Sequence, residues 1–279
     1  MHSSLPQQLT NFQFTRSRIL IRLFKKLEDF ALRSADVVIT ICSDLSDYVQ
    51  QVIQDPLKLI MIENSIFDPV KLLVENNKST NSGPKTEKGI DDSILAMSTN
   101  KRFIVYAGTL EPYQGIDILI KAFHKVIVEH QDAFLIIVGG DKSQVDFYKI
   151  LAVNNHLNGH VFLSGRVPQH VAQQYIHLAS VLVSPRTEGT NTPLKIYEQL
   201  ASGIPLVATN IYSHTQVLND SVAFLVEPNP EDMSDGLIKA LQADGAGKQK
   251  VENAKHLYEQ NYARPVYEIK MRYLLNLLK

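Results

Sequence analysis

The chain has 279 residues, of which 44% are hydrophobic and 20% charged, as in soluble globular proteins of one or two domains. Lys and Arg number 28 against 29 Asp and Glu, so we expect no nucleic-acid partner. The single Cys42 excludes an internal disulfide and a cysteine-based zinc site, and no apolar run approaches the ~20 residues of a membrane span. We therefore expect a cytoplasmic protein.

The first 74 residues contain few predicted elements. Residues 16–33 are basic and amphipathic, which predicts a packed helix with a solvated basic face or, as the alternative, a helix on an anionic membrane. Residues 37–41, 44–53 and 58–62 then predict one strand–helix–strand unit. One such unit cannot build a parallel sheet, so we interpret residues 1–74 as the remnant of a larger domain. We expect strand 37–41 and the C-terminal helix to lack packing partners.

The rest of the sequence, residues 75–279, predicts a linker followed by an α/β domain and a terminal helix. Residues 75–100 read as a flexible linker or insertion, since most of them are polar. Across 101–264, short apolar runs alternate with stretches of helical period, which indicates a parallel sheet covered on both faces. Residues 265–279 predict a terminal helix that returns towards the N-terminal part. The predicted strands are 103–106, 134–138, 161–163, 181–184, 206–209 and 223–226.

The first candidate site follows the strand that ends at Tyr106. Gly108 and a polar turn lead from this strand into an amphipathic helix that begins near Ile116. Ligands of open α/β sheets bind beyond the carboxyl ends of strands, where glycine lets the backbone approach a phosphate and a helix N-terminus supplies free N–H groups. The alternative, that Gly108 and Gly115 only make turns, stays open.

The second candidate site follows the strand that ends at Ser184. A loop rich in hydroxyl groups leads into a helix that we expect to start near Pro193. Lys195 can neutralise a phosphate, and Glu198 can accept two hydrogen bonds from a ribose. A solvated helix position is the alternative for Glu198.

The order of these motifs resembles the donor-binding domain of glycosyltransferase family 4. The resemblance covers roughly residues 100–279, and 1–66 resemble the end of an acceptor domain. It implies a GT-B fold, here with a complete C-terminal Rossmann-like domain and an incomplete N-terminal one. It also implies a nucleoside-diphosphate sugar donor, no metal or other cofactor, and a glycan, lipid-linked or small-molecule acceptor. The motifs are GTLEPYQGID, IIVGG, SGRVP, VLVSP, EGTNTPLKIYEQLASGIPLVAT and AFLVEPNPED.

The resemblance assigns nucleotide contacts residue by residue. Glu198 matches the second Glu of the family's E-x7-E pattern, which holds the ribose. Arg166 and Val167 lie in the turn that contacts the nucleobase. His2 resembles a histidine that faces the cleft from the acceptor side.

Two basic positions of the family pattern are absent from this chain. Gly108 and Thr109 stand where the family often has Gly-Arg, and Gln114 stands where a phosphate-binding Lys is common. A metal-free reaction needs charge to neutralise its leaving group. Lys195 and Arg186 are the candidates to replace the missing cations.

The first Glu of the pattern has two candidate positions. Thr190 stands eight residues before Glu198, whereas Glu188 stands ten before it and precedes a glycine as the family's residue does. We favour the Gly-Thr-Asn-Thr loop, with Asn191 and Thr192, as the contact for sugar and phosphate, and Glu188 as the second choice.

The resemblance implies a retaining, hexosyl-type glycosyltransferase. Lys195, the backbone at Gly108 and the helix N-terminus near Thr192 would stabilise the leaving diphosphate, with Glu188 and Thr190 as further catalytic candidates. Peripheral membrane contact is an added partner hypothesis. One alternative is a truncated, catalytically incompetent nucleotide-binding module. A nicotinamide-dependent oxidoreductase is disfavoured, because no G-x-G-x-x-G turn follows the first strand.

Overall fold

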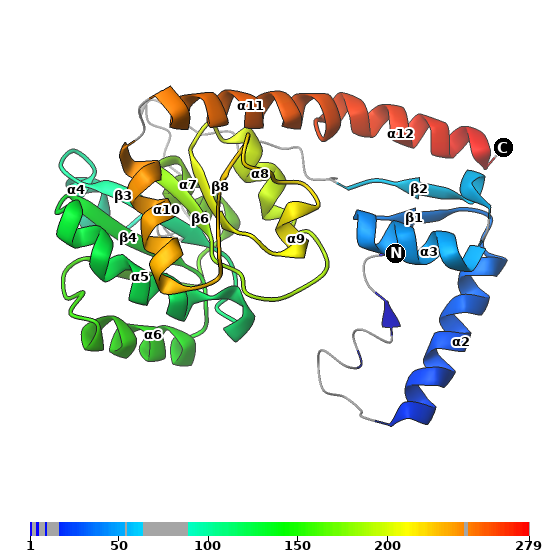
Figure 1. The fold of residues 1–279 in the computed structure, drawn as a ribbon, viewed down its shortest axis with the longest axis horizontal. Coiled ribbons are helices and arrows are strands. Elements are labelled where there is room, and N and C mark those ends of the chain that lie inside the picture. The colour runs from blue at the N-terminus through cyan, green and yellow to red at the C-terminus, as the bar shows by residue number, and fades with distance from the viewer. Residues whose placement is uncertain are drawn as a thin grey trace, which may run out of the picture.

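The computed structural model describes most of the chain. His2 and residues 64–88, which include the first part of the predicted linker, lie outside the described residues. The described residues form a larger α/β unit and a small N-terminal unit, and two C-terminal helices run along both (Figure 1). The described ranges are 17–53, 55–63, 89–242 and 245–278, with the single positions Met1, Ser4, Leu5 and Leu9.

The larger unit is built on a six-stranded sheet in the order β5-β4-β3-β6-β7-β8, with every neighbouring pair parallel. Each strand overlaps one of the predicted strands, so the predicted α/β class is confirmed. The strands are β3 (Arg102–Ala107), β4 (Ala133–Val138), β5 (Val161–Gly165), β6 (Ala179–Ser184), β7 (Leu206–Thr209) and β8 (Phe224–Val226).

Helices cover both faces of this sheet, as a buried parallel sheet requires. One face packs on α5 (Ile116–Glu129), α6 (Lys142–Asn154) and α10 (Pro230–Gln242). The other face packs on α4 (Asp92–Met97), α7 (Gln169–His177), α8 (Lys195–Ala201) and α11 (Gly245–Asn261). The short elements η2 (Pro112–Gln114) and α9 (Tyr212–Thr215) lie in connections that follow β3 and β7.

The strand order places a topological switch point between β3 and β6. The chain leaves β3 towards β4 on one side of the sheet, and it later returns to pair β6 with the other side of β3. The loops that follow these two strands therefore diverge at the carboxyl edge of the sheet. Such a switch point is where open α/β sheets bind their ligands.

Residues 92–97, which the composition places in a flexible linker, form α4 instead. Asp91 caps this helix through the backbone N–H of Ser93, and the Asp91 N–H donates to the hydroxyl of Tyr175 at 3.2 Å. Ile94 is fully buried against the sheet. The prediction is wrong here because the apolar residues Ile94, Leu95 and Met97 directly follow the polar stretch, and Ile94 and Met97 pack in the core on this face of the sheet.

The N-terminal unit is one strand–helix–strand unit, as predicted. Strands β1 (Val38–Thr40) and β2 (Leu59–Met61) pair in parallel, and α3 (Ser43–Ile53) connects them. The helix α2 (Arg18–Ser34) precedes β1, and the short η1 (Pro56–Lys58) lies between α3 and β2. Leu32 and Val49 pack with Val38 on the α2 and α3 side of the strands.

The C-terminal helix α12 (Arg264–Leu277) covers the opposite face of β1 and β2 (Figure 1). Leu274 packs on Ile60 and Ile62, and Lys270 forms an ion pair of 2.5 Å with Glu63. The expectation that strand 37–41 and the terminal helix lack partners is therefore wrong. The chain supplies each with the other, because the terminal helix returns to the N-terminal part, the direction expected from the sequence, and packs on the two strands.

The ends of β3 and β4 approach each other more closely than any side chain allows. Gly139 has φ 124°, and a Cβ atom on it would lie 1.9 Å from the carbonyl oxygen of Gly108. The Gly139 N–H meanwhile donates to Gly165 O at 3.0 Å, so the loop cannot move away without losing that bond. Only glycine fits at this position.

We predict that Gly139→Ala lowers the free energy of unfolding by about 3 kcal/mol or more, because the new methyl group meets backbone at a positive φ. The matched control is Gly159→Ala, since Gly159 also has a positive φ of 77° but nothing within 4 Å of its added Cβ. The control is expected to lose about 1 kcal/mol. Urea unfolding measures both variants, and equal losses would contradict the close-approach argument.

Candidate functional site

The loops that follow β3 and β6 contact each other directly at the switch point. The Thr187 N–H donates to the carbonyl of Tyr113 at 2.8 Å, and the Thr187 hydroxyl donates to the same oxygen at 3.2 Å. Gly115, with φ 69°, lies so close that an added Cβ would be 1.9 Å from Pro185 O. The two sequence segments singled out as candidate sites therefore form one site.

Lys195, the first residue of α8, projects into this site. Its Nζ lies 4.3 Å from the ring centroid of Tyr106 and 3.5 Å from the place where a Cβ on Gly108 would be. The nitrogen is buried and has no hydrogen-bond partner among the described residues. A buried ammonium without a hydrogen-bond partner is energetically unfavourable.

The electrostatics of the site follow from this burial. Desolvation, and then the positive charge of Arg186, lowers the pKa of Lys195 to about 7. Burial also lowers the pKa of Arg186 from its usual value. Two neighbouring cations that both lose hydration create a positive potential at the switch point.

Arg186 also organises its own loop. Its Nε donates to Glu188 O at 2.5 Å and its Nη1 donates to Asn191 O at 3.2 Å. The guanidinium carbon lies 5.3 Å from the ring centroid of Tyr113. The described contacts of Arg186 are thus with protein carbonyls and a ring, so it shapes the loop in addition to supplying charge.

The backbone next to Gly108 is fixed by Tyr106 and Gln114. The Tyr106 hydroxyl donates to Thr109 O at 2.6 Å, and Gln114 Nε2 donates to the Thr109 hydroxyl at 3.3 Å. The Oε1 atom of Gln114 is buried and lacks a hydrogen-bond partner in the described part of the chain. Gln114 therefore faces the site with one polar atom still to be satisfied.

Glu198 lies in the first turn of α8, three residues after Lys195. Its Oε2 accepts a hydrogen bond of 3.1 Å from Nε2 of Gln173 on α7. The exposed Arg166 and the partly buried Val167 lie just before α7, in the turn that follows β5. This hydrogen bond therefore connects Glu198, the predicted ribose contact, to α7, the helix that follows the predicted base-contacting turn.

The loop of residues 188–192 faces the N-terminal unit. The side chains of Glu188 and Thr190 are both exposed, so the choice between them as the sugar contact stays open. The Sγ of Cys42, just after β1, lies 3.7 Å from Asn191 Oδ1. Thr192, which follows these residues, is buried.

Gln216 connects the same loop to the N-terminal unit. Its Oε1 accepts from the backbone N–H of Asp44 at 3.0 Å, and its Nε2 donates to the carbonyl of Thr190. Gln216 therefore joins the N-terminal unit to this loop of the six-stranded unit, beside the contact of Cys42 with Asn191.

His214 forms hydrogen bonds with residues at the ends of β6 and β7, next to the site, a role that the sequence did not reveal. Its Nδ1 donates to Thr209 O at 2.9 Å, and its Nε2 accepts from the Ser184 hydroxyl at 3.0 Å. The hydroxyl of Thr209 donates in turn to Arg186 O. Burial lowers the pKa of the fully buried His214 to about 4, so the ring is neutral at physiological pH. Scattered histidines gave no signal of this network.

The described residues contain no group of three or more His, Cys, Asp and Glu side chains placed to hold a metal ion. None of the helices in the described ranges is both long and apolar enough to span a membrane.

The family comparison agrees with this geometry. Residues 87–260, more than half of the chain, match the family described as glycosyl transferases group 1. The chain belongs to this family. Assignment to family 4 within these glycosyltransferases is compatible with the match and stays a prediction.

Two curated relatives and one solved structure are similar to this chain. The chain is 30% identical over 141 residues to the phosphatidyl-myo-inositol mannosyltransferase of Mycobacterium tuberculosis, covering 48% of this chain and 36% of that protein. It is 23% identical over 176 residues to an uncharacterized glycosyltransferase of Methanocaldococcus jannaschii, covering 62% and 45%. The Anabaena HepE structure in complex with UDP has a TM-score of 0.68 at 16% identity, covering 88% and 65%.

The likeness to this solved structure confirms the GT-B fold expected from the resemblance. The chain spans less than half the length of these two curated glycosyltransferases.

We predict that acid destabilises the protein partly through His214. The folded pKa of about 4 lies below the usual value of 6.5, so between these values only the unfolded chain binds the proton. Stability from this source is complete above pH 6.5 and is lost as the pH falls towards 4, by about 2 to 3 kcal/mol at pH 4.5.

Urea unfolding at pH 7 and pH 4.5 tests this linkage. His214→Gln, whatever its stability at pH 7, is expected to lose about 2 to 3 kcal/mol less than the wild type between the two values. His177→Gln, at an exposed histidine, should behave like the wild type. An unchanged pH difference in His214→Gln would contradict a neutral buried ring.

Proposed function

We propose that this chain acts in sugar transfer from a nucleoside-diphosphate sugar to an acceptor hydroxyl, and that the site at the switch point binds the diphosphate. The observation that carries the proposal is the buried Lys195 Nζ, which has no hydrogen-bond partner among the described residues and lies beside the Gly108 backbone. A diphosphate supplies both the negative charge and the acceptor atoms that this nitrogen lacks.

The nucleoside would extend from the diphosphate towards α7. Glu198 carries two carboxylate oxygens, of which Gln173 occupies one, and a ribose offers two hydroxyl donors. Arg166 and Val167 in the turn after β5 would contact the base. UDP is the first candidate nucleotide, because it is bound in the related HepE structure.

The sugar would extend towards the loop that faces the N-terminal unit. Thr190 and Asn191 are the first candidates for its contacts, with Glu188 as the second choice. Lys195 would stabilise the charge that develops on the leaving diphosphate, which allows transfer without a metal ion. We propose retention of configuration and a hexosyl-type donor from the resemblance to family 4.

The acceptor would enter between the two units. One relative is named for mannose transfer to phosphatidyl-myo-inositol, which supports a lipid-linked acceptor as one candidate beside glycans and small molecules. A chain that binds the nucleotide without turnover is the alternative, and the assays below separate binding from catalysis.

We predict that Glu198→Ala weakens nucleotide binding by about 1 to 3 kcal/mol, because the ribose loses charged hydrogen bonds. Calorimetric titration with UDP, GDP and ADP measures this loss and identifies the base. The control is Glu259→Ala, at an exposed position on α11. Failure of the folded wild type to bind any of the three would contradict the proposal. Binding without hydrolysis or transfer of the matching nucleotide sugar would favour the binding module.

We predict that the affinity for UDP-glucose falls as the pH rises above 7. Lys195 has a pKa of about 7 in the free site, so below that pH it is already charged and above it binding must include proton uptake. One coupled proton lowers the affinity by roughly tenfold between pH 7 and 8.5. UDP-glucose serves because its diphosphate does not titrate in this range.

Calorimetry in buffers of different ionisation enthalpy counts this proton directly. At pH 8 the wild type should take up close to one proton on binding, whereas Lys195→Gln should bind weakly with no uptake. Lys142→Gln, exposed on α6, is the control. If proton uptake persists in Lys195→Gln, another group titrates and the assignment of Lys195 is wrong.

A further inference from the structure

The helix α2 presents large apolar side chains to solvent. It spans 17 residues, and only Glu28 and Leu32 are buried. The exposed fractions of Ile19, Leu23 and Phe30 are 79%, 50% and 70%. No other described helix combines such exposure with so many cations, since α2 also carries Arg18, Arg22, Lys25, Lys26 and Arg33.

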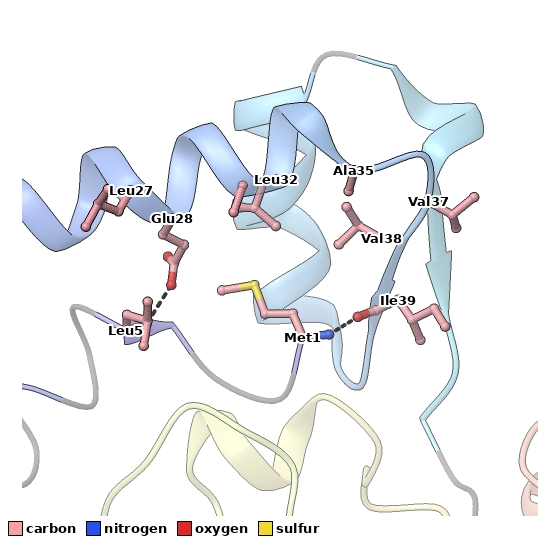
Figure 2. A pocket seen from close by; sticks show the side chains of 10 residues that line it. Met1, Leu5, Leu27, Glu28, Leu32, Ala35, Val37, Val38 and Ile39 are labelled. Carbon is pink, nitrogen blue, oxygen red and sulfur yellow. Dashed lines mark hydrogen bonds between the residues drawn. The ribbon is translucent and has the colours of Figure 1, made fainter.

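The inner side of α2 is fixed by contacts near β1 (Figure 2). A cavity of about 420 Å³ lies there, and Leu27, Glu28 and Leu32 line it together with Val38 and other residues. The Glu28 carboxylate accepts a hydrogen bond of 2.9 Å from the Ser4 hydroxyl and one of 2.6 Å from the Leu5 N–H. These contacts determine which side of α2 faces the protein.

The outward side of α2 follows from helical geometry. With about 3.6 residues per turn, Ile19, Leu23 and Phe30 lie opposite Glu28, and Arg22 and Lys26 lie beside them. The apolar stripe is therefore not the side that faces the cavity.

The charge of the outward side is also one-sided. The two carboxylates of α2 are Glu28, which is buried, and Asp29, which accepts a hydrogen bond of 3.1 Å from the Tyr48 hydroxyl. Neither lies among the exposed apolar side chains. A second copy docked through this stripe would bring two basic flanks together, which like-charge repulsion disfavours.

We propose that α2 binds the surface of an anionic lipid bilayer and lies parallel to it. Ile19, Leu23 and Phe30 enter the boundary between headgroups and acyl chains, and Arg22 and Lys26 contact the anionic headgroups. An apolar stripe flanked by cations is the composition of such interfacial helices. This surface lies outside the switch-point site, so the proposal stands independently of the transfer reaction.

Co-sedimentation of the whole chain with vesicles tests the proposal. We expect binding to phosphatidylcholine vesicles that contain phosphatidylglycerol, and at least tenfold weaker binding to phosphatidylcholine alone. Each basic residue near an anionic surface contributes about fivefold. The variant R22Q/K26Q should therefore bind roughly 20- to 30-fold more weakly, and 0.5 M NaCl should weaken the wild type in the same direction.

The apolar part is tested by L23S/F30S, which should bind at least tenfold more weakly at unchanged charge. All these residues are exposed, so unfolding midpoints should stay at the wild-type value. The matched controls on α6 are F147S/I150S and K142Q/K149Q, which change exposed side chains of the same kinds and should bind like the wild type.

Three results would overturn the proposal. One is equal binding to neutral and anionic vesicles, and another is wild-type binding by both α2 variants. The third is light scattering that shows a dimer in the wild type and a monomer in L23S/F30S, because the stripe would then be an interface between copies.

Discussion

The site depends on one buried charge, the ammonium group of Lys195. Burying that charge requires the loops after β3 and β6 to close around it, which the hydrogen bonds from Thr187 to Tyr113 O accomplish. The same burial requires a partner for the charge, which the described protein atoms do not supply. Arg186 makes a partner for this charge more necessary, because it adds a second positive charge nearby and donates its own hydrogen bonds to loop carbonyls. The unfavourable burial of this charge is relieved when an anion binds beside Lys195, as proposed above, or when the lysine loses its proton.

Much of the larger unit could be predicted from the sequence, because its signals are local. Apolar runs gave all six strands, and the Gly-rich turn and Lys195 lay where parallel strands end. The contacts that complete the site are different in kind. Cys42 meets Asn191 across 149 positions, and His214 joins Ser184 and Thr209 through a network that no spacing rule describes. The roles of Glu198, Arg166 and Thr190 stay predictions, because their geometry is compatible with the proposal and does not test it.

The two places where the predicted architecture failed have one physical cause. Residues 92–97 were assigned to the linker together with the polar stretch before them, and strand 37–41 looked too isolated to be covered. In both cases the missing partner lies far along the chain: Tyr175 and the sheet for α4, and Leu274 and its neighbours on α12 for the two strands. Burial of a few apolar side chains at long range outweighs the local composition, and such pairings are invisible to a pattern read over ten or fifteen residues.

Gln216 has a mechanical consequence. Its amide holds the N–H of Asp44 on one side and the carbonyl of Thr190 on the other, so a single side chain spans the gap between the two units. Rotating the units apart breaks at least one of these bonds, and the loop that carries Thr190 is also the loop that Arg186 ties to Lys195's surroundings. A change in the angle between the two units would therefore move the loop that carries Thr190, and with it the two carbonyl groups to which Arg186 donates.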